Sequence, residues 1–123
     1  KEIVITDAGM NDFIRPSLYA SHHGIDAAST SAEPTLRANI VGPVCESGDF
    51  FANDRLIADV EPGELLVLRA TGAYGYSMAS NYNSRPRPAE VLVDGSRFAV
   101  ITERESDADL TRHENFAPDW IED

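Results

Sequence analysis

Lysine is almost missing from this 123-residue chain, because Lys1 is the only one against nine arginines. Cysteine is equally scarce: Cys45 stands alone, which excludes an internal disulfide and a zinc site built from several cysteines. A single cysteine fits a reducing, cytoplasmic compartment. No stretch approaches the ~20 apolar residues of a membrane-spanning helix, and the chain does not begin with a signal-peptide pattern. We therefore expect no membrane partner.

Positive charge is also in short supply. Ten basic side chains against 21 acidic ones give a formal net charge of −11 at pH 7. Such a surface repels phosphate groups, so nucleic acid is excluded as a partner. The length of 123 residues predicts one domain and is too short for a (β/α)₈ barrel, which needs about 250 residues. Hydrophobic residues make up 42% of the chain, enough for an ordinary core.

Short apolar segments separated by glycine and proline predict a mainly β fold. Pro and Gly at the centre of Glu61–Glu64 predict a type II turn. No long helical period is present, so we expect a β-barrel or β-sandwich with one or two short helices. The strands are expected at residues 1–6, 24–27 and 39–44, and, as a buried strand, at residues 65–68.

The strongest hairpin signal lies between residues 89 and 102. Asp94-Gly95 is typical of a type I′ turn, and a two-residue loop there would place Val91 opposite Phe98. Ser106 is a suitable cap for a short helix that follows it. We therefore predict a β domain over residues 1–105, followed by a short helix and a polar tail over residues 106–123.

Cys45-Glu-Ser-Gly-Asp49 brings a thiol, two carboxylates and a glycine within five positions. This suits a loop pressed against a ligand, with Gly48 allowing close approach. Cys45 could act as a nucleophile or proton donor, and Glu46 could bind an amine. The alternative is a buried cysteine packed as a small hydrophobe beside a solvated acidic turn. No third ligand of matched spacing accompanies Glu46 and Asp49, so no metal site is expected.

A second cluster is Arg15-Pro-Ser-Leu-Tyr19. Pro16 is suited to the first turn of a short helix, and Arg15 and Tyr19 would then project from the same side. A guanidinium beside a phenol can receive a carboxylate, because arginine binds it bidentately. The alternative is a surface arginine stacked along a partly buried tyrosine.

The third cluster is Gly72-Ala-Tyr-Gly-Tyr76. Small residues around Tyr74 leave room for a ligand, and the phenol could donate to a phosphate oxygen. The alternative is a bulged strand in which Tyr74 and Tyr76 point to opposite faces. The adjacent side chains of His22 and His23 point in different directions in most conformations, so no shared metal is expected. Both are expected on the surface.

Taken in order, these segments resemble diaminopimelate decarboxylase. The resemblance is collinear from about Ile3 to Arg104. The Cys-Glu-Ser-Gly-Asp run resembles an element of related amino-acid decarboxylases too. The Arg-Pro-Ser-Leu-Tyr run and the Asn-Ser-Arg-Pro-Arg-Pro-Ala-Glu-Val run are specific to the diaminopimelate branch. The matching segments are Val4–Asp12, Arg15–Tyr19, Gly42–Asp49, Gly72–Tyr76 and Tyr82–Val93.

The resemblance implies that this chain is only part of an enzyme. Members of that family have a (β/α)₈ barrel that holds pyridoxal phosphate on a lysine, followed by a C-terminal β domain, and this chain resembles the second. A Schiff base needs a lysine amine. Lys1 has no motif around it, so we expect the chain alone to be inactive and to need the barrel domain as its partner.

The resemblance also implies roles in a carboxy-lyase that converts meso-2,6-diaminopimelate to L-lysine and carbon dioxide, the last step of lysine biosynthesis. Arg15 and Tyr19 would bind the distal carboxylate of the substrate, and Glu46 the distal ammonium. Cys45 would donate a proton to the carbon that has lost carbon dioxide. Tyr74 would contact the cofactor phosphate and border the substrate.

Family active sites lie at a homodimer interface, so Cys45 and Glu46 would reach the site of the neighbouring subunit. The alternative function is a free-standing β-barrel module that binds an anionic or zwitterionic small ligand. It would use Arg15, Tyr19 and Tyr74 without a cofactor lysine.

Overall fold

The structure is a computed structural model that describes residues 2–29 and 33–121. Lys1 lies outside the described residues. Within these residues, seven strands, two short α-helices and two 3₁₀ turns follow one another. In order they are β1 (Glu2–Ile5), α1 (Arg15–Tyr19), β2 (Ile25–Ala27), β3 (Leu36–Val41), β4 (Phe50–Ile57), β5 (Leu66–Leu68), η1 (Tyr76–Met78), η2 (Tyr82–Ser84), β6 (Glu90–Asp94), β7 (Arg97–Thr102) and α2 (Asp107–Thr111).

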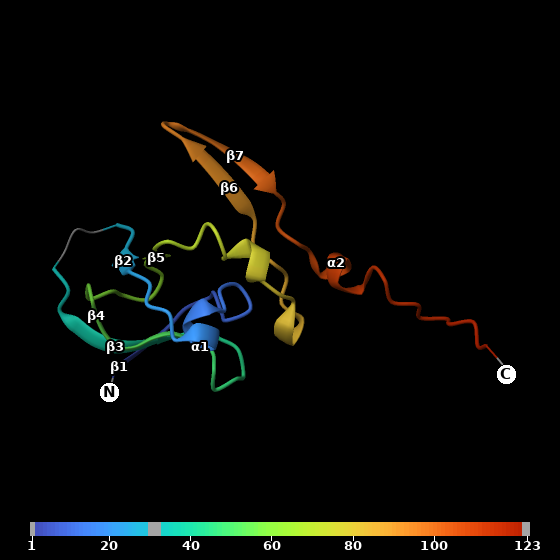
Figure 1. Cartoon of the computed structure of the whole chain (residues 1–123), viewed down its shortest axis with the longest axis horizontal. Helices are drawn as coiled ribbons and strands as arrows, with labels where there is room; N and C mark the ends of the chain where they lie inside the picture. The colour runs from blue at the N-terminus through green and yellow to red at the C-terminus, as the bar shows by residue number, and fades with distance from the viewer. Residues whose placement is uncertain (1, 30–32, 122–123) are drawn as a thin grey trace.

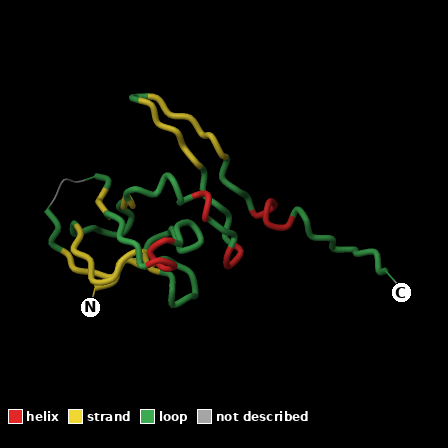
Figure 2. Tube along the Cα trace, viewed as in Figure 1, coloured by secondary structure: helices red, strands yellow, loops and turns green. Residues whose placement is uncertain are grey.

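The core lies between two small sheets. In the first, β3 is central, with β1 parallel on one side and β4 antiparallel on the other. The second sheet pairs β2 with β5, which are antiparallel. Figure 2 shows these strands gathered in one body of the molecule. The buried cluster that they share consists of Phe13, Ile25, Ile40, Phe51, Ala52 and Ile57.

The predicted fold class is confirmed, because the chain is mainly β with two short α-helices. The strands in the described part of the chain form three separate sheets and do not close into a barrel. Closure requires every edge strand to find a partner. Among the described strands, β6 and β7 pair with no other strand than each other, and their hairpin extends away from the rest (Figure 1).

The hairpin was predicted at the right place but in the wrong register. Val93, not Val91, lies opposite Phe98, and the two-residue loop is Gly95-Ser96. Gly95 has φ +60°, which fits a turn with glycine at its first central position. Asp94 is the last residue of β6, and its carboxylate pairs with the Arg97 guanidinium across the turn.

Strand β4 was not predicted. Its residues Phe51 and Ala52 are both buried, which breaks the alternation expected of a strand with one face toward the core. The register against β3 shifts between Ala38 and Ile40, and Asp54 takes φ +49°. The Asp54 N–H donates to Asn39 Oδ1 at 2.9 Å, which satisfies the group that the irregular ladder leaves unpaired.

Several local predictions are confirmed. Pro16 is buried in the first turn of α1, and Ser106 forms a capping box with Asp109 at the start of α2. Gly63 has φ +94° in the type II turn at Glu61–Glu64. Strand β5 is less buried than expected, because Val67 is 37% exposed at the edge of its two-stranded sheet. Among the described residues, no helix has the length and apolar character needed to cross a membrane.

Candidate active site

The loop at residues Asp7–Asp12, here called the anchor loop, holds the candidate segments in place. It follows β1 and leads into α1, and three other parts of the chain are tied to its backbone. The Met10 N–H donates to Asp49 Oδ1 at 2.7 Å. The Asn11 carbonyl accepts the Ser80 N–H at 2.9 Å. The Asp7 carbonyl accepts Arg85 Nη2 at 2.6 Å.

Asp49 fixes the loop that carries Cys45 and Glu46. Its buried carboxylate accepts N–H donors from Met10 at 2.7 Å and Val44 at 2.5 Å. Gly42 lies so close that a β-carbon there would stand 2.4 Å from both carboxylate oxygens. With its base held this way, the loop presents Cys45 and Glu46 at an exposed tip. The alternative of a buried, packed cysteine is therefore wrong.

Gly48 allows the same loop to pack on α1. A β-carbon on Gly48 would lie 2.9 Å from Ser17 Oγ, closer than real β-carbons approach. The group that approaches Gly48 closely in this structure is therefore helix α1 of the same chain. Because Arg15 and Tyr19 lie on α1, this packing sets the loop beside the helix that carries the second cluster.

Glu46 is held by two donors. Its Oε1 accepts the Gly48 N–H at 3.1 Å, and its Oε2 accepts the Tyr82 hydroxyl at 3.2 Å. The Gly48 N–H, and then the Tyr82 hydroxyl, lower the pKa of the Glu46 carboxyl. The same contact raises the pKa of Tyr82, because the charged carboxylate disfavours a phenolate. Tyr82 was not among the predicted site residues, because a pairing 36 residues apart leaves no local signal.

Arg15 lies between two tyrosines. Its guanidinium carbon is 4.8 Å from the centre of the Tyr74 ring and 5.4 Å from that of the Tyr19 ring. Both distances are within the range of a cation–π contact. No ion pair among the described residues involves Arg15. The three predicted residues thus come together, and Tyr19 is 58% exposed rather than partly buried beneath the arginine.

Tyr74 lies in a turn that leads into η1, so the alternative of a bulged strand is wrong. A β-carbon on Gly72, two residues before Tyr74, would meet nothing within 4 Å, so the space beside Gly72 is open. Within the part of the chain that the structure describes, no hydrogen bond or ion pair joins Arg15, Tyr19 or Tyr74 to Cys45 or Glu46. The candidate residues therefore form two groups.

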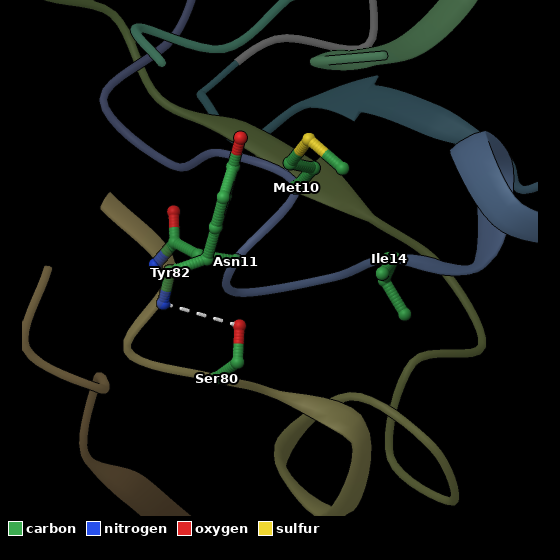
Figure 3. A pocket seen from close by; sticks show the side chains of 5 residues that line it. All are labelled: Met10, Asn11, Ile14, Ser80 and Tyr82. Carbon is green, nitrogen blue, oxygen red and sulfur yellow. Dashed lines mark hydrogen bonds between the residues drawn. The ribbon is translucent and has the colours of Figure 1, made fainter. Parts of the chain in front are cut away.

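A cavity of about 240 Å³ lies next to Tyr82 (Figure 3). Figure 3 shows the Tyr82 ring and Met10 on its walls, with the Ser80 hydroxyl accepting the Tyr82 N–H, a contact of 3.3 Å. The lining is almost wholly apolar apart from Asn11 and Ser80, so the cavity offers packing rather than charge. It is lined by Met10, Asn11, Ile14, Ser80 and Tyr82.

His23 is buried, so the expectation that both adjacent histidines lie on the surface is wrong for this one. Its ring meets Phe13 edge-on, with centroids 4.6 Å apart, and its Nδ1 lies 3.0 Å from the Arg69 carbonyl. His22 is exposed. No group of three or more histidine, cysteine, aspartate or glutamate side chains that could hold a metal lies within residues 2–29 and 33–121.

Residues 1–72 match the family described as pyridoxal-dependent decarboxylase, C-terminal sheet domain. The match covers more than half of the 123 residues, and the chain belongs to this family. Within it, the chain is similar to diaminopimelate decarboxylases. It is 57% identical over 106 residues to that of Neisseria meningitidis serogroup B, covering 86% of this chain and 25% of the relative. It is 48% identical over 122 residues to that of Archaeoglobus fulgidus, covering 98% of this chain and 29% of the relative.

Solved structures agree with the sequence comparison. The diaminopimelate decarboxylase of M. jannaschii in co-complex with L-lysine is 42% identical with a TM-score of 0.85, over 92% of this chain and 26% of that one. A lysine/ornithine decarboxylase from Vibrio vulnificus, 21% identical over 66% of this chain and 22% of that one, has a TM-score of 0.56 and shares the fold alone. The resemblance drawn from the sequence segments is confirmed. The chain spans about a quarter of the length of the relatives it matches.

Proposed function

We propose that this chain is the substrate-recognising part of a diaminopimelate decarboxylase, which converts meso-2,6-diaminopimelate to L-lysine and carbon dioxide. The observation that carries this proposal is Arg15, a cation set between Tyr19 and Tyr74 and without an acidic partner among the described residues. The likeness to diaminopimelate decarboxylases supports it. One similar solved structure holds L-lysine, the product of the proposed reaction.

Arg15 distinguishes this substrate from simpler amino acids. Diaminopimelate carries a carboxylate at the end remote from the reacting carbon, and a guanidinium binds a carboxylate with two parallel hydrogen bonds. Ring contacts with Tyr19 and Tyr74 restrict the guanidinium before the substrate arrives, which reduces the entropy lost on binding. Substrates such as ornithine and lysine lack this distal carboxylate and would leave the receptor unpaired.

Glu46 and Cys45 complete the proposed roles. The Glu46 carboxylate would bind the distal ammonium of the substrate, and its lowered pKa favours the charged form that this requires. The exposed Cys45 thiol would donate a proton to the carbon that has lost carbon dioxide. We propose that both act in the active site of the second subunit of a homodimer.

Pyridoxal phosphate would be held mainly by the part of the enzyme outside this chain, and it supplies an electron-withdrawing ring when bound. The described residues fit a contact with its phosphate at Tyr74. That side chain is 54% exposed, its hydroxyl has no hydrogen-bond partner among the described residues, and the space beside Gly72 is open. The cofactor lysine would come from the barrel domain, because the only lysine here is Lys1.

We also propose that residues 1–105 form the folded domain and residues 106–123 its helix and tail. Glu105 is tied back to the body, because its carboxylate accepts the Arg87 N–H at 2.8 Å and Asn81 Nδ2 at 2.5 Å. Beyond it, Phe116 is 83% exposed and Trp120 is 88% exposed. Figure 1 shows this segment running outward from the rest of the molecule.

The full-length enzyme, loaded with pyridoxal phosphate, tests the proposed function. Release of carbon dioxide is measured from meso-2,6-diaminopimelate, L-lysine and L-ornithine at equal concentrations. We expect diaminopimelate to be preferred on the order of 10²-fold or more, since the other two leave a charged receptor unpaired. Equal rates with all three substrates, or no reaction with diaminopimelate, would contradict the proposal. This chain alone should release none, because it lacks the barrel domain.

A further inference from the structure

We infer that Tyr82 is a positioning residue for the amine-binding carboxylate, fixing the orientation of Glu46 through its hydroxyl. The inference rests on the proposed function, in which Glu46 receives the distal ammonium of the substrate. It adds a residue to the site whose side chain need not touch the substrate, since it acts through Glu46.

The hydrogen bonds around Glu46 define one orientation of its carboxylate. Each oxygen has one donor: the Gly48 N–H lies 3.1 Å from Oε1, and the Tyr82 hydroxyl lies 3.2 Å from Oε2. A carboxylate offers about four acceptor positions. Two therefore stay available, one on each oxygen, for the N–H groups of an ammonium. Without Tyr82, only the Gly48 N–H would restrain the exposed side chain.

The two partners of this hydrogen bond are anchored independently to one backbone segment. The Glu46 loop is tied to the anchor loop through the Met10 N–H and Asp49. The segment that carries Tyr82 is tied to it on both sides, through the Ser80 N–H and the Arg85 guanidinium. The Tyr82–Glu46 contact is thus set by the fold rather than formed by chance between two free side chains.

The surroundings of Tyr82 separate its ring from its hydroxyl. The ring borders the cavity lined by Met10 and Ile14 and supplies packing there (Figure 3). The hydroxyl donates to the Glu46 carboxylate, and Glu46 is not among the residues that line the cavity. Removal of the hydroxyl alone should therefore change how Glu46 is presented and leave the packing of the ring unchanged.

The test uses the full-length enzyme loaded with pyridoxal phosphate and the variant Tyr82→Phe. We expect the KM for diaminopimelate to rise about 3- to 10-fold, the size expected for one hydrogen bond, with kcat within about twofold of wild type. Tyr76→Phe is the matched control, because the Tyr76 hydroxyl has no hydrogen-bond partner among the described residues. Its KM should stay within about twofold of wild type.

Two further kinetic comparisons distinguish a positioning role of Tyr82 from a general loss of activity. The first uses 2-aminopimelate, which keeps the distal carboxylate but lacks the distal amine, and Tyr82→Phe should leave its KM unchanged. The second comparison uses the double variant Tyr82→Phe/Glu46→Gln. Its KM for diaminopimelate should equal that of Glu46→Gln alone, because the side chain that Tyr82 positions has already lost its charge. Thermal unfolding of every variant checks that the fold is intact.

Three results would overturn the inference: an unchanged KM for diaminopimelate in Tyr82→Phe, an equal rise for 2-aminopimelate, or additive effects in the double variant. A Tyr82→Phe enzyme that failed to fold would overturn it too, because the hydroxyl would then be structural. Failure of the proposed function looks different, since the wild-type enzyme would then not decarboxylate diaminopimelate at all.

Discussion

The Asp49 carboxylate occupies the space that a side chain on Gly42 would need. Both of its oxygens lie 2.4 Å from the position of a β-carbon on Gly42, and the Gly42 N–H donates to the Asp49 carbonyl at 3.1 Å. Gly42, just after β3, and Asp49, at the base of the Cys45 loop, are therefore in close contact and joined by a backbone hydrogen bond. The requirement for glycine here is one of space, because Gly42 is not among the glycines with positive φ.

Gly42→Ala should destabilise the enzyme by about 1–3 kcal/mol, the usual cost of forcing an extra carbon into a filled site. Gly72→Ala is the matched control, since a β-carbon there meets nothing within 4 Å and should cost less than about 0.5 kcal/mol. Chemical unfolding of the full-length variants measures both. Equal midpoints for the two variants would show that the Asp49 carboxylate moves aside freely.

Arg15→Ala should raise the KM for diaminopimelate at least about tenfold, because the distal carboxylate loses a bidentate charged partner. Arg15→Lys should restore part of the loss, since it keeps the charge but not the planar fork. Arg37→Ala is the control: this exposed arginine pairs with Asp54 at 3.2 Å on the surface of the sheet. Steady-state kinetics provide the measurement, and an unchanged KM in Arg15→Ala would remove Arg15 from the site.

Cys45→Ala should lower kcat by about 10²-fold or more, the scale of a lost general acid, and should change the KM much less. Ser47→Ala, an exposed neighbour on the same loop, serves as the control and should retain kcat. Single-turnover measurements separate protonation from product release. A variant that kept the wild-type kcat would mean that another group donates the proton.

Glu105 should make stability depend on pH in the acid range. Its pKa is lowered, first by the Arg87 N–H and then by the Asn81 amide, both of which favour the charged form. A group with a depressed folded-state pKa stabilises the fold above its ordinary value of 4.5, and this contribution disappears as the pH falls through the lowered value. Glu105→Gln should therefore lower the Tm near neutral pH.

The difference in Tm between wild type and Glu105→Gln should narrow as the pH is lowered from about 7 to about 3. Thermal melts of the full-length proteins at several pH values measure this. Glu61→Gln, an exposed glutamate in the type II turn, supplies the comparison. A difference that stayed constant with pH would assign the effect of Glu105 to packing instead of charge.

Features specified by neighbouring residues were predictable from the sequence. Pro16 marks the first turn of α1, Gly63 marks a turn, and the pair Ser106 and Asp109 marks the start of α2. Each of these depends on a backbone preference or a hydrogen bond within a few residues. The same applies to Arg15 and Tyr19, whose spacing of four places them on one side of a helical turn.

Features that depend on distant residues were not predictable in this way. Strand β4 has no regular alternation of buried and exposed side chains in its sequence, because a bulge at Asp54 disturbs it. The hairpin register depends on which two residues form the loop, and Asp94-Gly95-Ser96 allows more than one choice. The contact between Glu46 and Tyr82 joins segments 36 residues apart, so only the fold reveals it.

The anchor loop has a consequence for how this protein tolerates change. It holds the other segments through the Asp7 carbonyl, the Met10 N–H and the Asn11 carbonyl, all of them main-chain groups. Most replacements at the exposed Asp7 keep its carbonyl in place, so a substitution library should find this position permissive. Deletion of one residue would shift the spacing of all three at once. The spacing of these main-chain groups therefore matters more to the site than the side chain of Asp7.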